Sequence, residues 1–326
     1  MSLDADHIVD RRRMRRKLTF WRVVAVLIAV AGVGALAYAL APQATGLAGS
    51  NYIARIKIQG LIRGDAERVE ALDRLGRSTT AKAVIVHVDS PGGTTAGAEQ
   101  LYDALTRLKG RKPVVAVIDG LAASGGYIAA IAADHIVAQE TSLVGSIGVL
   151  FQYPNFTELL KTLGVQVEAI KSSPLKAAPS GFEPTSQEAR AALEAVVRDT
   201  YEWFQRLVQT RRSMDQPQLE RVSDGRVFTG RQGLGLKLID ALGDEKTAVA
   251  WLTREKKVEA GTPVRNYKLE SRLSDLSFLH LAAITVLESV GLRSLAQHVE
   301  TWGTLQAVER LNLDGLLALW HPPVQK

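Results

Sequence analysis

Short apolar runs alternate with segments of helical periodicity through the middle of the chain. The runs are rich in Val, Ile and Ala and predict strands, whereas the intervening segments carry apolar residues at helical spacing. The expected strands are Tyr52–Ile58, Ala83–Val88, Val114–Ile118, His135–Ala138 and Val165–Ile170. The expected helices lie near Glu67–Leu75, Ala98–Leu108, Tyr127–Ala132 and Phe156–Leu163. Strands that alternate with helices predict an α/β fold with largely parallel strand pairing.

Two further helical regions follow. A long amphipathic helix is predicted from Ser186 to Arg212, because a capping signal at Ser186 precedes an apolar stripe at helical spacing. Its stripe is expected to pack on the core. Beyond Thr262 the pattern weakens, and Leu276–Leu292 is apolar but too short and too interrupted to span a membrane. That segment could pack on the core, on a sister subunit or against a membrane surface.

An uncharged apolar run, Val23–Ala41, precedes the alternating pattern. Its 19 residues would span roughly the 30 Å hydrocarbon core of a bilayer as a helix. The alternative is a cleaved secretory signal with Ala39-Leu40-Ala41 as its cleavage site. The run exceeds the roughly 7–15 residues of a signal core, and Pro42 would follow the cut. We therefore expect an uncleaved transmembrane signal anchor.

The basic residues gather on one side of this run. The chain has 40 Lys and Arg against 34 Asp and Glu, and most of the surplus lies before residue 23, where seven basic residues face three acidic ones. The positive-inside rule therefore predicts a single-pass membrane protein with a cytoplasmic N-terminus and the rest on the extracytoplasmic side. The remainder is nearly balanced in charge, so nucleic acid is not an expected partner, although the basic cluster alone could contact it.

These patterns divide the chain into five parts. They are a basic cytoplasmic tail (1–22), the transmembrane signal anchor (23–41), a Gly/Ala/Ser-rich linker (42–51), the main domain (52–262) and a C-terminal helical extension (263–326). The chain contains no cysteine, which excludes a disulfide scaffold, a zinc-thiolate site, an iron–sulfur cluster and a cysteine nucleophile.

Candidate chemistry lies in three glycine-rich turns that follow apolar strands. The first is Asp89–Gly93, whose backbone amides could hold an oxyanion, although a structural turn would look the same. The second contains Ser124 among small residues at the expected start of a helix, where it could be a nucleophile or a plain N-cap. The third contains Ser146, which could only assist a catalytic group by hydrogen bonding.

A serine nucleophile needs a base, and the histidines supply no good candidate. They are His7, His87, His135, His280, His298 and His321. His87 lies inside an apolar strand, His135 begins one, and the others lie before the anchor or in the weakly patterned tail. A serine, histidine and aspartate triad is therefore poorly supported. A desolvated lysine is the other base available to serine, and Lys171 and Lys176 both lie in a small-residue loop after an expected strand.

Together these segments resemble the signal peptide peptidase A family. The shared motifs, in family order, are DSPGG (Asp89–Gly93), AASGGY (Ala122–Tyr127), GSIGV (Gly145–Val149), KSSPLK (Lys171–Lys176) and SDGRVFTGRQGLGLKLIDALG (Ser223–Gly243). The resemblance implies an α/β Clp protease/crotonase-like fold of repeated β-β-α units, preceded by one transmembrane helix. It implies Ser124 as nucleophile and Lys176 as general base. Oxyanion donors would be the amides of Gly92 and Gly125, with Gly93 as an alternative, and Ser146 would assist.

The resemblance also implies an activity, a substrate class and an assembly. Members of the short form are membrane-bound serine endopeptidases that act through a Ser-Lys dyad and an acyl-enzyme on remnant signal peptides or other unfolded segments. They assemble into rings, commonly octamers, in which neighbouring subunits share a site. No metal, nucleotide or organic cofactor is implied, and alkaline-leaning activity is expected because the lysine must be neutral. The alternatives are a crotonase-like acyl-CoA enzyme and a catalytically silent membrane scaffold.

Overall fold

The computed structural model describes residues 17–24, 28, 32, 50–269 and 316–319. The chain separates into two compact units, Met1–Ser50 and Asn51–Lys326. In the first unit, residues 17–24 are helical. Most of the predicted anchor and of the C-terminal extension, including Leu276–Leu292, lies outside the described residues. Among the residues that are described, no helix is both long and apolar enough to cross a membrane.

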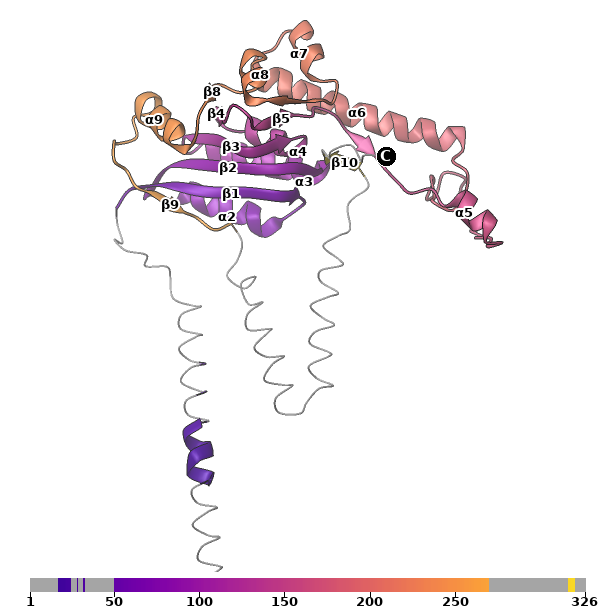
Figure 1. The fold of residues 1–326 in the computed structure, drawn as a ribbon, viewed down its shortest axis with the longest axis horizontal. Coiled ribbons are helices and arrows are strands. Elements are labelled where there is room, and N and C mark those ends of the chain that lie inside the picture. The colour runs from indigo at the N-terminus through magenta and orange to yellow at the C-terminus, as the bar shows by residue number, and fades with distance from the viewer. Residues whose placement is uncertain (1–16, 25–27, 29–31, 33–49, 270–315, 320–326) are drawn as a thin grey trace, which may run out of the picture. The chain divides into compact units, whose positions relative to one another are not determined.

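The second unit is built on one mixed sheet of ten strands in its described part (Figure 1). The strands are β1 (Tyr52–Ile62), β2 (Ala81–Thr94), β3 (Val114–Ala123), β4 (His135–Ala138), β5 (Leu143–Gly145), β6 (Leu150–Phe151), β7 (Val227–Thr229), β8 (Ala241–Leu242), β9 (Val264–Asn266) and β10 (Leu316–Leu319). Neighbours along β1-β2-β3-β4-β8 are parallel, which confirms the predicted pairing. The prediction found the first four of these strands and missed the six short ones.

The three long strands each have two sections. The register between β1 and β2 shifts after Gln59, and the register between β2 and β3 shifts after Val88. Along β3 the first section pairs with β4 and the last three residues pair with β5. A two-section strand followed by a helix therefore recurs along the chain, so the expected β-β-α unit is present with its two strand sections run together.

Helices cover both faces of this sheet. They are α2 (Ala66–Arg77), α3 (Thr95–Lys109), α4 (Gly125–Ile131), α5 (Thr157–Thr162), α6 (Gln187–Arg212), α7 (Gln216–Val222), α8 (Gly230–Gly235) and α9 (Glu245–Lys256). Successive strand residues point to opposite faces. Val84 and Val86 accordingly join the core formed with α2, α3 and α4, whereas Ile85 joins a second core formed with α9. The DSPGG segment, expected as a turn, is instead the last section of β2 after its register shift, whereas AASGGY joins the end of β3 to α4.

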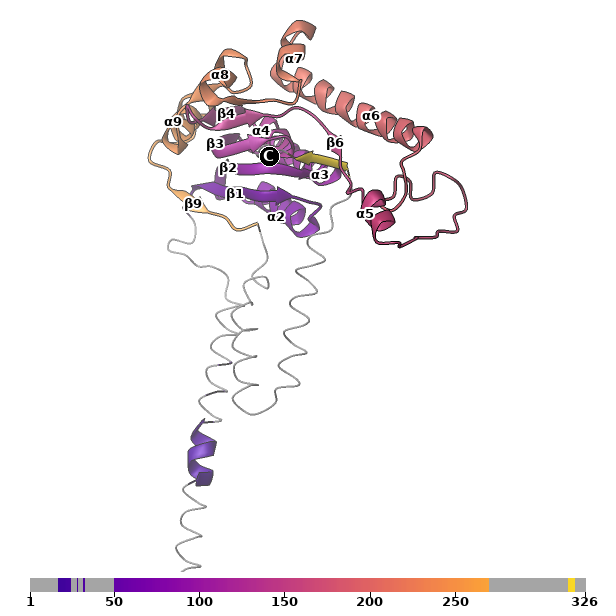
Figure 2. The ribbon, with the colours of Figure 1, turned by 45° about the vertical axis from the view of Figure 1, so that its right-hand side comes forward.

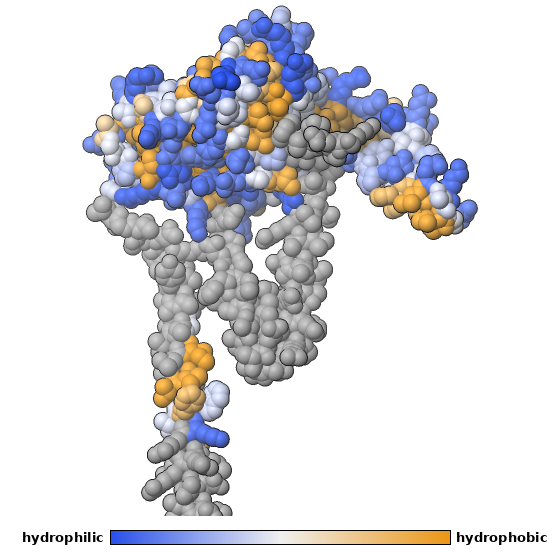
Figure 3. All heavy atoms as spheres, in the orientation of Figure 1, coloured by the Kyte–Doolittle hydropathy of each residue, from blue (hydrophilic) through white to orange (hydrophobic). Residues whose placement is uncertain are grey.

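An arm, residues 152–186, leaves the sheet after β6 and carries α5 (Figures 1 and 2). The strand predicted at Val165–Ile170 is wrong: these residues form no ladder within the described chain, and Val165, Val167 and Ile170 are exposed. A strand needs a partner for its backbone groups, which periodicity alone cannot supply. Apolar side chains show on the arm in the space-filling view (Figure 3). The helix predicted after the arm is confirmed as α6, with Ser186 as its N-cap.

Candidate active site

Ser124 lies where β3 ends and α4 begins. Its side chain is 1% exposed, and its backbone has φ 53° and ψ −116°, a conformation that residues other than glycine rarely adopt. The residue occupies the N-cap position of α4, yet its hydroxyl makes no capping hydrogen bond. Instead, Oγ donates weakly to the carbonyl of Gly148 at 3.4 Å. Ser124 is therefore not a plain N-cap, and its strained positive-φ backbone must have another cause.

The backbone around Ser124 provides donors for negative charge. Gly125 is the first residue of α4, and the first N–H groups of a helix have no partner within the helix. A side chain at Gly126 would put its Cβ 2.6 Å from the carbonyl oxygen of Ser90. This close approach brings the DSPGG and AASGGY turns together, so their amides can face one reacting group.

The amide of Gly92 has a partner in this structure. It donates to Oγ of Ser90 at 3.1 Å, and that hydroxyl donates to the carbonyl of Gly60 at 2.6 Å. Gly92 also has φ 104°, which requires glycine. As an oxyanion donor, Gly92 would have to exchange the Ser90 hydroxyl for substrate, whereas the first-turn amide of Gly125 needs no such exchange.

Ser146 lies close to Ser124, because the residue before it, Gly145, accepts a backbone hydrogen bond from Ser124. The N–H of Ser124 donates to the carbonyl of Gly145 at 2.8 Å, and Ser146 has φ 50° and donates its own N–H to Arg226. The GSIGV turn therefore faces Ser124, and its Gly148 also lines a cleft of about 690 Å³ between this turn and α6. The cleft reaches Ser124 through Gly148 and combines apolar side chains with the charges of Arg190, Glu194 and Arg198.

Neither candidate lysine contacts Ser124 within the described part of the chain. Lys176 is exposed in the loop of the arm, where its backbone N–H donates to the backbone carbonyl of Ser173. The ammonium of Lys171 forms an ion pair with Glu183, and this hydrogen bond lowers the pKa of the Glu183 carboxyl. The structure thus groups Ser124, Gly92, Gly125 and Ser146, whereas Lys176 belongs to the arm, residues 152–186, which extends away from the sheet (Figure 2).

The α4 helix that carries Ser124 is held at its other end. The guanidinium of Arg211, from α6, donates to the last carbonyls of α4 and of the following turn, those of Ile131 at 2.7 Å and Ala133 at 2.8 Å. The phenol of Tyr127 is fully buried and donates to Leu238 at 2.8 Å. Burial raises the pKa of Tyr127, so this donor stays protonated at neutral pH. Neither residue was identified as functional by sequence reasoning.

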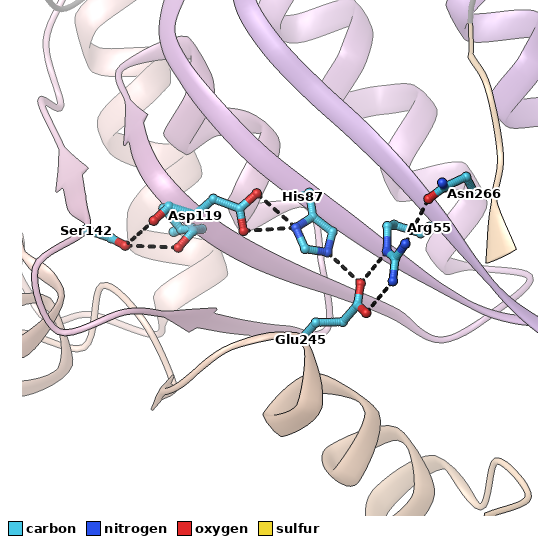
Figure 4. Close-up of polar contacts among 7 residues, drawn as sticks. Arg55, His87, Asp119, Ser142, Glu245 and Asn266 are labelled. Carbon is cyan, nitrogen blue, oxygen red and sulfur yellow. Dashed lines mark hydrogen bonds and ion pairs between the residues drawn. The ribbon is translucent and has the colours of Figure 1, made fainter. Parts of the chain in front are cut away.

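His87 belongs to a separate network on the α9 side of the sheet (Figure 4). Its Nδ1 lies 2.9 Å from the Asp119 carboxylate, and its Nε2 lies 2.8 Å from Glu245. Arg55 forms a bidentate ion pair with Glu245 and also donates to Asn266. Because both ring nitrogens of His87 are engaged, this histidine cannot accept a serine proton.

The other histidine in the described domain is structural as well. The His135 ring stacks on Trp251 at 4.6 Å between ring centroids, and burial lowers its pKa. Neither described histidine of the domain is therefore available as a base for Ser124, in agreement with the sequence.

The His87 network predicts a pH-dependent stability. The hydrogen bonds from Arg55 lower the pKa of Glu245, so the carboxylate stabilises the fold above its ordinary pKa, and this contribution is lost as pH falls through the folded value. Glu245→Gln should lower the free energy of unfolding by about 1–2 kcal/mol at pH 7. Urea unfolding at pH 7 and pH 3.5 should show the deficit shrinking at the lower pH. A deficit that is equal at both values would contradict the assignment.

Comparison with known proteins supplies the family. The model of peptidase family S49 matches residues 106–259, and that of Clp protease matches residues 63–142. The putative protease slr0021 of Synechocystis is 36% identical over 201 residues, which cover 61% of this chain and 72% of that protein. The chain belongs to peptidase family S49. It is therefore a serine protease, with the Clp protease-like α/β fold that the second match supports.

Two other relatives match this chain over smaller shares of their own length. The putative protease MJ0651 of Methanocaldococcus jannaschii is 34% identical over 56% of this chain and 58% of its own length. The putative signal peptide peptidase SppA of Enterococcus faecium is 30% identical over 59% of this chain and 56% of its own length. The chain thus spans somewhat over half of the length of these two relatives. The S49 match includes Ser124, Ser146 and Lys176, and membership of a peptidase family favours a protease over the acyl-CoA enzyme and the silent scaffold.

Proposed function

We propose that the chain is a membrane-anchored serine endopeptidase that cleaves remnant signal peptides and other unfolded or membrane segments through a Ser124–Lys176 dyad. The observation that carries the proposal is the backbone of Ser124, which holds a positive φ at the start of α4 while its hydroxyl makes no cap. Strain of this kind clusters at functional sites because the surrounding structure must maintain it.

The roles follow from the chemistry of the groups. Neutral Lys176 accepts the proton of Ser124 as Oγ attacks the scissile carbonyl, and a tetrahedral oxyanion forms. The amide of Gly125, together with that of Gly92 or Gly93, holds the oxyanion. Lys176 then gives the proton to the leaving amine, and the acyl-enzyme remains on Ser124. Water, deprotonated by Lys176, hydrolyses the ester, and Ser146 assists by hydrogen bonding near the lysine.

Two features of the arm support Lys176 as the base. Lys171 is engaged by Glu183, whereas Lys176 makes no ion pair within the described residues. The arm also exposes apolar side chains that a monomer leaves in water, including Phe156, Leu159, Leu163 and Ile170. Burial against another copy would remove this area from water. We therefore assign the base of each site to a neighbouring subunit of a homo-oligomeric ring, which we propose to be an octamer.

The location and substrate of the proposed enzyme rest on the sequence and on its relatives. The run at residues 23–41 and the basic residues before it favour an inner-membrane anchor with the protease domain on the periplasmic side. The E. faecium relative carries signal peptide peptidase in its name. A protease held at the membrane surface is well placed for peptides that remain in the bilayer after secretion.

Hydrolysis of a synthetic signal peptide in detergent micelles tests this function. The detergent-extracted full chain should cleave the free peptide and leave a folded secreted protein intact. A fluorophosphonate, which acylates activated serines, should label Ser124 and abolish cleavage. Stoichiometric labelling at another residue, or cleavage that survives complete labelling of Ser124, would contradict the proposal. The Ser124→Ala chain is the control for contaminating proteases.

A further inference from the structure

Basic side chains gather at the end of the sheet where its central strands begin. Because β1, β2 and β3 are parallel, they start at one end, and Ser124 follows β3 at the other (Figure 1). The helices α2, α3 and α9 run back to the starting end and carry Arg and Lys in their last turns. The group, called the basic end below, consists of Arg77, Lys82, Lys109, Arg111, Lys112 and Lys256.

Contacts hold one half of the basic end together. The Lys112 ammonium donates to the carbonyl of Ala81 at 2.7 Å, directly before Lys82. Burial lowers the pKa of Lys112, and the charge of Lys82 lowers it further. The Arg111 side chain packs on the last turn of α2, where a Cβ at Gly76 would lie 3.2 Å from its Cδ. The end of α2, the start of β2 and the turn before β3 therefore contribute charge to one surface.

The other half lies toward α9. Burial lowers the pKa of Lys109, and the charges of Arg211 and Lys256 add to this effect. Asp134 opposes the shift and lies 3.6 Å from the Lys256 ammonium. Apart from Lys256, the members of the basic end form no ion pair within the described residues. Positive charge therefore exceeds negative charge over this surface.

Helix dipoles explain only part of this charge. The carboxyl end of a helix attracts cations, and Arg77 and Lys109 each lie in a last turn. Lys82, Arg111 and Lys112 lie outside the helices, so the dipoles do not account for them. An unpaired surplus of one sign at one end of a domain attracts a partner of the opposite sign.

We infer that the basic end docks on anionic phospholipid headgroups. The inference rests on the proposed membrane anchor and deepens it, because β1 begins at this end, directly after the linker 42–51. Ten linker residues reach at most about 36 Å, which keeps this end close to the bilayer that the anchor would cross. Basic residues next to a membrane are attracted to anionic lipids within a Debye length. Nucleic acid is anionic too, but the linker does not bring it to this end.

Energy transfer from the domain to the headgroups tests the docking. The chain has no cysteine, so Thr79→Cys takes a single donor dye at an exposed position beside the basic end. The labelled full chain is placed in nanodiscs that carry a headgroup acceptor, made of phosphatidylcholine alone or with about 30% phosphatidylglycerol. Transfer should be higher with phosphatidylglycerol. The increase should vanish at about 1 M NaCl, where the Debye length is about 3 Å.

A second label reports the orientation of the domain. Ala66 is exposed at the start of α2, beyond the far end of β1, whose 11 residues extend about 36 Å. A donor at Ala66→Cys should therefore show a smaller increase in transfer than one at Thr79→Cys. An increase of equal size at both positions would contradict docking by the basic end.

Paired substitutions separate this surface from net charge. Lys82→Gln with Arg111→Gln removes two exposed charges of the basic end, and Lys57→Gln with Arg231→Gln removes two exposed charges elsewhere. With phosphatidylglycerol, the ratio of docked to undocked domain should fall about 10–30-fold in the first pair and stay near the wild type in the second. Melting temperatures show whether each pair is folded, and the salt response of the wild type needs no substitution.

Two results would overturn the inference: transfer that does not depend on lipid charge, and transfer that falls equally in both pairs. Chains that do not co-elute with phosphatidylcholine nanodiscs would instead reject the proposed anchor. For such chains, sedimentation with phosphatidylglycerol vesicles but not with phosphatidylcholine vesicles would still support the basic end. Sedimentation with neither would reject it.

Discussion

Alanine at Ser124 or at Lys176 is expected to lower kcat about 1,000-fold or more, and a mixture of the two inactive chains is expected to regain activity. The large loss follows because nucleophile and base act as a unit, so removal of either leaves only binding and oxyanion stabilisation. The recovery follows from the arm that carries Lys176, because it extends away from the sheet (Figure 2) and the Ser124 hydroxyl bonds to Gly148 rather than to a lysine of its own chain.

The fraction of activity that mixing restores can be calculated if each site takes its serine from one chain and its lysine from a neighbour. With random assembly from equal amounts, about one quarter of the sites combine an intact serine with an intact lysine, as expected for a ring of heterologous interfaces. Peptide hydrolysis should therefore return to about a quarter of the wild-type rate after the detergent-dissociated chains are reassembled together. A mixture that stays inactive, although its subunits have exchanged, would place serine and lysine in the same chain.

Lys171→Ala is the matched control for the lysine. It lies in the same loop and carries the same charge, but its ammonium is paired with Glu183. Activity within a few-fold of the wild type is expected for this variant. Loss of activity at Lys171 with retention at Lys176 would reverse the assignment of the base.

Gly93→Ala is expected to produce the largest loss of stability among single substitutions in the site. A Cβ at this position would lie 1.8 Å from the carbonyl oxygen of Ile62 and 2.6 Å from its backbone carbon. Both contacts are with the backbone of β1, which pairs with β2 at this point and cannot turn aside as a side chain could. Overpacking that forces backbone to move costs about 1–3 kcal/mol and occasionally more, and we expect the upper end of that range or above.

The control for this effect is Gly235→Ala, because a Cβ there meets nothing within 4 Å. Urea unfolding should place Gly235→Ala close to the wild type and Gly93→Ala well below it. If Gly93→Ala unfolds at the wild-type urea concentration, the close packing of β1 against the DSPGG turn is not as described.

The fold was predictable from sequence wherever an element was long and periodic. The strands β1 to β3 and the helix α6 were found because their buried positions recur at regular intervals. Apart from β4, the short strands escaped, since so few residues carry no measurable period. The strand β10 was inaccessible for a further reason: its partners lie more than 160 residues away, and pairing at such distance leaves no local signal.

The candidate site was predictable to a similar degree. Turn chemistry marked Ser124 and the glycines, because small residues after a buried strand are unusual unless a backbone must approach closely. The backbone strain at Ser124 has no signature in the residue types and appears only in the structure. The His87 network was overlooked, although Arg55 and His87 lie among the apolar residues of two neighbouring strands and could have indicated a polar cluster.

The α6 helix links the arm to α4, the helix that begins directly after Ser124. It begins at Gln187, directly after its N-cap Ser186 at the end of the arm, and its last turn supplies the guanidinium of Arg211 to the carbonyl end of α4. A helix of 26 residues is about 39 Å long. Because α6 is continuous, a displacement of the arm in the proposed ring would be passed through Arg211 to α4, the short helix that Ser124 precedes.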